Sequence, residues 1–218
     1  MLAMLLTFKK LLVNRVVQGV VLGIGIFLMI YPFIPQIKFE LEKRLNAKIY
    51  DESYYVDKYM SDRPATGLEL SEVDPMRRAV GVDVGKRLII PSIGVDIELV
   101  YDDNQDRALS KGAWVIPGSA SPGESGQMVI TGHRFQFTPP AKNTFYNLDK
   151  LKTGDTFIIT YDGFAYKYQV SKTEEVKPED YNYEGAGSAT DEVVLYTCTP
   201  LWTAANRLIV HSSQVVFE

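Results

Sequence analysis

An uncharged apolar segment near the N-terminus opens the hydrophobic pattern of the chain. It covers Val16–Ile34, about nineteen residues without a charged side chain. At a rise of about 1.5 Å per residue, a helix of this length nearly spans a hydrocarbon core of about 30 Å. Lys9, Lys10 and Arg15 precede the segment, and basic residues favour the cytoplasmic side of a membrane. We therefore predict a single transmembrane helix in the plasma membrane, with a cytoplasmic N-terminus.

A cleaved signal peptide is the competing interpretation of this segment. Its apolar region would be shorter and would end in small residues of the Ala-x-Ala type. The residues that follow, Tyr31–Gln36, have no such pattern. The Gly-rich, all-round apolar character of the segment also argues against a buried core helix. The pattern therefore favours an uncleaved anchor.

The next fifty residues have no apolar repeat long enough for a domain core. Ile37–Leu45 is weakly amphipathic and could extend the anchor as a helix, whereas Asp51–Asp83 is polar and broken by proline and glycine. We predict a stalk that could dock on the domain that follows. The chain then divides into a cytoplasmic N-terminus (1–15), an anchor (16–34), an extracytoplasmic stalk (35–85) and a folded domain (86–218).

From Lys86 onward, short apolar runs alternate with turn signals. Asp162 and Gly163 separate two alternating runs and form a strong hairpin signal. About eight short strands at this spacing are typical of a closed β-barrel or a β-sandwich. The predicted strands are Arg87–Ile90, Val95–Tyr101, Gln127–Thr131, Asp155–Tyr161, Phe164–Val170, Val193–Thr197, Arg207–His211 and Gln214–Phe217, with a helical turn at Thr144–Leu148.

Composition and charge narrow the possible functions only a little. The hydrophobic fraction of 46% is ordinary for a globular protein, and the net charge of −4 gives no sign of nucleic-acid binding. The single cysteine, Cys198, is more informative, because extracytoplasmic domains use cysteines in disulfide pairs. A lone cysteine there is inert, linked to another chain, or reactive.

Three polar side chains lie at the edges of predicted strands. Cys198 ends one apolar run, Arg207 opens the next, and His133 closes an earlier one. A thiol nucleophile needs a proton carrier and a cation for developing negative charge. The three residues therefore form a candidate set for nucleophilic catalysis. One cysteine and two distant histidines give no ligand spacing for a metal, so we expect no metal or other cofactor.

At these residues the sequence resembles the sortases, membrane-anchored cysteine transpeptidases of bacterial cell surfaces. The resemblance covers nearly all of residues 86–217, in order, and each of its motifs would be weak alone. Its segments are Thr131–Arg134, Leu195–Cys198 and Arg207–Val210, together with Leu88–Asp96, Gly112–Gly118, Pro122–Gly123 and Leu148–Asp155. The resemblance implies an all-β fold with short helices, a closed eight-stranded β-barrel of the sortase type.

The resemblance also implies roles for the three polar residues. Cys198 would attack a backbone carbonyl of a C-terminal sorting signal, which has a Leu-Pro-x-Thr-Gly-like motif, and form a thioacyl-enzyme. His133 would give a proton to the leaving amine and later take one from the incoming nucleophile. Arg207 would stabilise the oxyanion or the peptide carbonyls. The expected acceptor is an amine of a peptidoglycan precursor or of a pilin lysine.

Other polar and aromatic residues near these motifs have weaker assignments. Thr197, Trp202 and Phe135 are candidates for substrate binding, and aromatic packing is the alternative for the last two. Arg134 is expected to have a structural or rim role, because adjacent strand positions point apart. His211 is expected to lie at the rim, outside the catalytic set.

Two details leave the subclass open. The gap of eight residues between Cys198 and Arg207 resembles the pilin-polymerising class and one housekeeping class, and Asp74–Met76 faintly resembles the lid motif of pilin sortases. Val194 stands where the family usually has Thr, and we expect its side chain to point away from the thiol.

The sequence bears on three alternative functions. L,D-transpeptidases have a Ser-His-Gly-Cys run and papain-like hydrolases place Cys before His, and neither pattern occurs here. A barrel that has lost activity and serves as a surface binding or assembly module stays open as an alternative.

Overall fold

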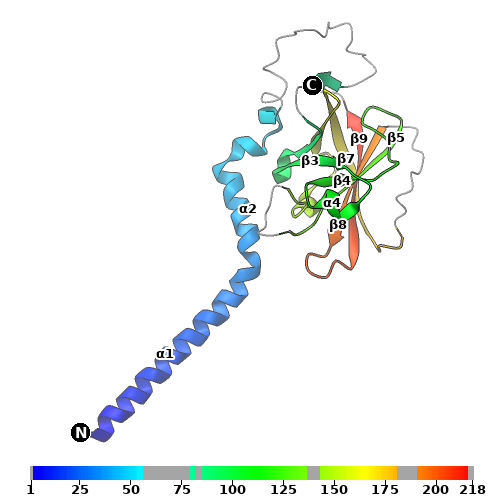
Figure 1. Ribbon diagram of the computed structural model, residues 1–218. Helices are drawn as coiled ribbons and strands as arrows, with labels where there is room; N and C mark the ends of the chain where they lie inside the picture. The colour runs from blue at the N-terminus through cyan, green and yellow to red at the C-terminus, as the bar shows by residue number, and fades with distance from the viewer. Residues whose placement is uncertain (1, 56–78, 82–84, 137–142, 181–190, 216–218) are drawn as a thin grey trace. The chain divides into compact units, whose positions relative to one another are not determined.

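The computed structural model describes residues 2–55, 79–81, 85–136, 143–180 and 191–215 (Figure 1). The chain forms two compact units, Met1–Leu41 and Glu42–Glu218. The predicted lid motif at Asp74–Met76 lies outside the described residues.

The N-terminal part of the chain is helical. It contains α1 (Leu2–Ile30), a short 3-10 turn η1 (Tyr31–Phe33) and α2 (Ile34–Leu45). Within the described residues, one continuous helical stretch, Asn14–Leu45, is long and apolar enough to cross a membrane, with a mean hydropathy of 2.1 and none of that window buried. An apolar helix with unburied side chains is a candidate single membrane anchor.

Eight strands of the second unit close into a barrel in the described part of the chain (Figure 1). Their order is β7-β6-β2-β3-β4-β5-β8-β9, and pairing of β9 with β7 closes the ring. The predicted closed eight-stranded barrel is therefore confirmed. Its strands are β2 (Arg87–Ile90), β3 (Val95–Tyr101), β4 (Ala113–Val115), β5 (Gly126–Thr131), β6 (Thr156–Tyr161), β7 (Phe164–Val176), β8 (Asp191–Thr199) and β9 (Asn206–Val215).

Short elements connect or extend these strands. A ninth strand, β1 (Ala79–Gly81), adds to the start of β7 outside the closed ring. Helical pieces among the described residues of this unit include η2 (Ala47–Tyr50), η4 (Pro91–Ile93), α4 (Gln105–Leu109) and η5 (Leu148–Lys150). The 3-10 turn therefore begins at Leu148, the last residue of the helical turn that the sequence predicted.

Two strand predictions need correction. The runs Arg207–His211 and Gln214–Phe217 belong to one strand, β9, up to Val215. Ser212 does not end the strand, because its buried hydroxyl donates to the Val193 carbonyl of β8 at 2.6 Å. The sequence did not predict β4, because this strand has only three residues, between Gly112 and the turn that leads to Pro117. Three residues are too few to show an alternating pattern.

Alternation along β8 divides its side chains between two apolar clusters. Val193 and Leu195 face the barrel core, whereas Val194 and Tyr196 pack on the outer face with Ile209 of β9. Positions four apart share a face of a strand, so Val194 and Cys198 lie on the same face. The expectation that Val194 points away from the thiol was wrong, and the outer cluster continues toward Cys198.

The beginning of the predicted stalk packs on the barrel. Glu52 accepts a hydrogen bond from Thr156 at 2.5 Å and forms an ion pair with Lys167 at 2.8 Å. The Tyr50 ring lies 2.6 Å from the position that a β-carbon on Gly94 would take, where the backbone has a φ of +68°. We call Asn46–Tyr55 the clasp. It belongs to the same compact unit as the barrel.

Candidate active site

The pairing of β8 with β9 places the thiol beside the guanidinium-bearing residue. These strands are antiparallel, and Cys198 is directly opposite Arg207. Directly opposed residues project from the same face, with β-carbons about 4.5–5.5 Å apart. The two side chains, separated by eight residues in the sequence, are therefore immediate neighbours on the outer face.

The pairing of β5 with β8 brings the histidine to the same level. These strands are parallel, with Thr131 beside Tyr196, so His133 and Cys198 each lie two positions further on. Gly132 continues the alignment, because its amide donates to the Tyr196 carbonyl and its carbonyl accepts from the Thr197 hydroxyl at 2.7 Å. By alternation, His133 shares the outer face with Cys198. The three residues thus form a row across β5, β8 and β9.

The exposure of this row suits chemistry on an incoming chain. His133 is exposed, and Cys198 and Arg207 are partly buried. The Arg207 Nη1 atom donates to the carbonyls of Ala204 and Asn206 at 3.2 and 3.1 Å, which holds the guanidinium against the β8–β9 loop. Among the described residues, no carboxylate pairs with Arg207. Its positive charge is therefore not neutralised within that part of the chain.

The second histidine is engaged elsewhere. His211 lies four residues beyond Arg207 on β9, a separation of about 13 Å at the usual rise of a strand. Its Nε2 atom lies 2.8 Å from a carboxylate oxygen of Glu174. The hydrogen bond from Lys172 and, to a smaller extent, the hydrogen bond with His211 lower the pKa of Glu174. His211 is thus part of a polar cluster on β7 and β9, apart from the row.

The candidate substrate-binding residues fall into two groups. Phe135 and Trp202 come from different loops, yet their rings meet at 4.9 Å with a tilt of 57°. They are 40% and 73% exposed, so the pair presents an aromatic surface formed by the segments that follow His133 and Cys198 in the sequence. Thr197, in contrast, is 1% exposed, and its hydroxyl is bound to Gly132. The structure brings Thr197 to the row but gives its hydroxyl an internal partner.

Sequence reasoning missed one feature of this region. Arg134 is buried, and its Nη2 atom forms an ion pair with Asp149 at 3.0 Å. The two residues are far apart in the sequence, and neither the spacing nor the residue types identify them as partners. The only signal was that both lie in motifs of the family resemblance.

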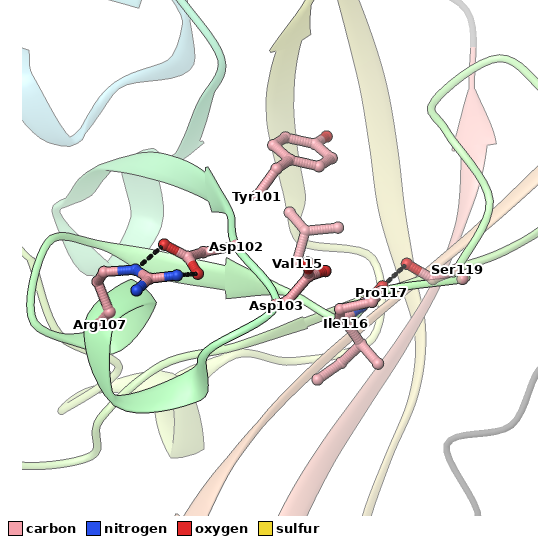
Figure 2. A pocket seen from close by; sticks show the side chains of 9 residues that line it. Tyr101, Asp102, Asp103, Arg107, Val115, Ile116, Pro117 and Ser119 are labelled. Atoms are coloured by element: carbon pink, nitrogen blue, oxygen red, sulfur yellow. Dashed lines mark hydrogen bonds and ion pairs between the residues drawn. The ribbon is translucent and has the colours of Figure 1, made fainter.

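A cavity of about 460 Å³ lies elsewhere on the barrel (Figure 2). Its lining comes from the ends of β3 and β4 and from the turn at Pro117–Ser119, and Figure 2 shows Arg107 binding Asp102 through two dashed contacts. Because β4 is antiparallel to β5, its C-terminal end lies toward the start of β5, away from the end that carries His133. This cavity therefore does not hold the candidate chemistry.

The row brings together the three kinds of group that acyl transfer through a thiol needs. A sulfur nucleophile, an imidazole and a cationic fork of donors lie side by side and accessible. Within the described residues, no group of three His, Cys, Asp or Glu side chains could hold a metal ion.

Comparison with known protein families gives one domain match. Residues 88–215 match the model of the sortase domain, which is more than half of the chain and includes all three residues of the row. Among curated proteins, the chain is 28% identical to sortase D of Bacillus subtilis (strain 168) over 131 residues. That alignment covers 59% of this chain and 62% of the relative, so the chain spans less than two thirds of its length.

Solved structures give the same fold. Sortase C1 of Streptococcus agalactiae is 32% identical, with a TM-score of 0.55 over 61% of this chain and 68% of that one. Sortase C-1 of Actinomyces oris is 32% identical, with a TM-score of 0.53 over 61% and 74% of the two chains. A further similar structure, of sortase C from Streptococcus pneumoniae, is described in its title in terms of pilin substrate specificity.

Proposed function

The chain belongs to the sortase family, and we propose that it is a cysteine transpeptidase that cleaves a C-terminal sorting signal and transfers the protein to an amine. One observation carries this proposal: strand register alone aligns His133, Cys198 and Arg207 on one face. A catalytic site needs these three side chains together on one face. The alternative function, an inactive surface module, has no need of that arrangement.

In the first half-reaction, the thiol proton of Cys198 passes to His133, and the resulting thiolate attacks the scissile carbonyl carbon so that a C–S bond forms. Negative charge develops on the carbonyl oxygen, and the N–H groups of Arg207 stabilise it. His133 then gives its proton to the departing nitrogen as the C–N bond breaks. A thioester on Cys198 and a free C-terminal fragment result.

In the second half-reaction, an amine attacks the thioester carbonyl. His133 takes the proton from the attacking nitrogen, the new C–N bond forms and the C–S bond breaks. The thiolate is regenerated. The acceptor that fits the family is an amine of a peptidoglycan precursor or a pilin lysine, and no cofactor is required.

Binding of the peptide involves the aromatic pair. Phe135 and Trp202 offer an apolar wall beside Cys198, suited to the leucine and proline of a Leu-Pro-x-Thr-Gly-like signal. We propose that Thr197 contributes through its main chain and by holding Gly132, since its hydroxyl is buried. The proposed location is the plasma membrane, with segment 16–34 as the anchor and the barrel outside the cell.

The test uses the purified full chain in detergent with quenched fluorescent sorting peptides and an added amine. Wild type should cleave and transfer, whereas Cys198→Ala should be inactive and folded. A methanethiosulfonate reagent can modify only one thiol, because Cys198 is the only cysteine. It should abolish turnover. An unreactive thiol, together with no cleavage of any peptide, would favour the inactive module.

The Arg207→Lys variant tests whether Arg207 acts through the fixed geometry of its N–H donors or only through its positive charge. An ammonium cannot reproduce the guanidinium geometry, so the variant should recover little of the roughly 10²–10³-fold loss typical for a missing oxyanion donor. A near-normal rate in the lysine variant would show that the guanidinium geometry is not needed for turnover.

A further inference from the structure

A buried cation directly after the histidine is not used by the chemistry above. Arg134 is 9% exposed, and one of its nitrogens pairs with Asp149. Its Nε and Nη1 atoms are buried and have no hydrogen-bond partner among the residues that the structure describes. Burying a charged group with donors unpaired is unfavourable, so packing alone would favour an apolar residue here. Such local violations tend to occur at functional sites.

The imidazole of His133 has no partner of its own to orient it. Among the described residues, none forms a hydrogen bond or an ion pair with its ring, and the ring is exposed. In thiol and hydroxyl enzymes, a third group commonly orients the catalytic base. Within the described part of the chain, the contacts that restrain His133 are made to its main chain and to its neighbours in the sequence.

Anchors lie before, at and after His133. The preceding carbonyl, of Gly132, accepts from the Thr197 hydroxyl, and the carbonyl of His133 accepts from the Phe145 amide at 2.8 Å. On the other side, Arg134 reaches Asp149. The Leu148 amide donates to the Phe145 carbonyl at 3.1 Å, and Leu148 begins η5, which contains Asp149. One short segment, Phe145–Lys150, thus contacts both the main chain of His133 and the side chain of Arg134.

We propose that Arg134 and Asp149 are positioning residues that fix the imidazole of His133 through its main chain. The proposal rests on the proposed function, because a fixed imidazole matters for turnover only if His133 transfers protons. The ion pair supplies a directional restraint that an apolar side chain at position 134 would lack. This restraint is a reason for keeping a costly buried arginine beside the site.

The experiment uses the full chain in detergent and two variants of the pair. Arg134→Met removes the charge while keeping a long side chain, and Asp149→Asn removes the partner charge at constant size. Arg107→Met is the matched control, because it breaks another Arg–Asp pair, with Asp102, and neither residue belongs to the row or to its contacts. Two readouts are needed: NMR signals of the histidine rings, and kcat with KM for a sorting peptide.

The chain has two histidines, so His211 provides an internal reference in the spectrum. A His211→Gln variant assigns the two signals. We expect Arg134→Met to shift or broaden the His133 ring signals and leave those of His211 unchanged. We expect kcat to fall about 10- to 100-fold, the size of a small misplacement of a catalytic group, with KM within about threefold. Asp149→Asn should act in the same direction, and Arg107→Met should change neither readout.

Unchanged His133 signals and unchanged kcat in folded Arg134→Met would overturn the proposal. A loss of thermal stability alone would also overturn it, since that is what a merely structural pair would give. If Arg134→Met does not fold, Asp149→Asn and Arg134→Lys are judged by the same two readouts. If wild type cleaves no sorting peptide, the proposed function fails, while the ring signals still decide whether the pair positions His133.

Discussion

Replacing Thr197 by valine separates a structural role from substrate binding at this position. The two side chains have nearly the same shape, so Thr197→Val removes the hydroxyl and little else. In the structure, this hydroxyl donates to the Gly132 carbonyl at 2.7 Å in a buried setting. The substitution leaves that carbonyl without this donor, one residue before His133.

The expected loss of stability follows from this contact. A buried polar group that loses its partner costs about 1–3 kcal/mol in the free energy of unfolding. For a unit of this size, each kcal/mol lowers Tm by about 2–4 °C, so Tm should fall by about 2–12 °C. Turnover should fall roughly tenfold, equivalent to about 1.4 kcal/mol of misalignment between His133 and Cys198, with little change in KM.

The assay is thermal unfolding by circular dichroism, together with steady-state cleavage of a sorting peptide. Ser212→Ala is the matched control, because its buried hydroxyl also donates to a main-chain carbonyl of a neighbouring strand, that of Val193, away from the row. This control should lose stability and keep its turnover. The reasoning is refuted if Thr197→Val keeps its Tm and raises only KM, since the hydroxyl would then contact the substrate.

Three further predictions concern other parts of the molecule. His133→Ala should lower kcat by roughly 10²–10⁴-fold, whereas His211→Ala should stay within a few fold, as measured with the same peptide; equal losses would mean that the wrong histidine was chosen. Glu52→Gln should lower Tm without changing kcat, because Lys167 loses its charged partner in the clasp, and an unchanged Tm would show that the clasp contributes nothing. The hydrogen bond from Arg107 lowers the pKa of Asp102 to about 2, so the stability that this carboxylate contributes should be present above its ordinary pKa and lost as the pH falls toward 2; an NMR titration in which Asp102 protonates at its ordinary pKa would contradict this.

The strands of the barrel could be predicted where apolar alternation is strong and turn signals are clear. β2 and β3 have the predicted bounds, and the hairpin at Asp162 and Gly163 joins β6 to β7. Pattern fails where a strand is very short, as in β4, or where a buried hydroxyl replaces an apolar residue, as at Ser212. In both places, contacts with neighbouring strands determine that the segment is a strand, and the local sequence does not show it.

The candidate site could be found from the sequence, but the network that supports it could not. Motif order identifies His133, Cys198 and Arg207, and register aligns them as neighbours. The sequence does not identify the ion-pair partner of Arg134, because the chain has many carboxylates that could pair with an arginine. Likewise, the sequence gives no reason for the Thr197 hydroxyl to choose the Gly132 carbonyl over a substrate. Such pairings depend on the closed barrel, which brings distant segments together.

The central claim, that Cys198 is an acyl-transfer nucleophile, is tested most directly by the mass of the intact protein. The full chain is mixed with a sorting peptide without an amine acceptor and quenched in acid. We predict an added mass equal to that of the N-terminal peptide fragment minus one water, located on Cys198 and released by hydroxylamine, as a thioester requires. No such adduct in an enzyme that cleaves the peptide, or an adduct on another residue, would contradict the account.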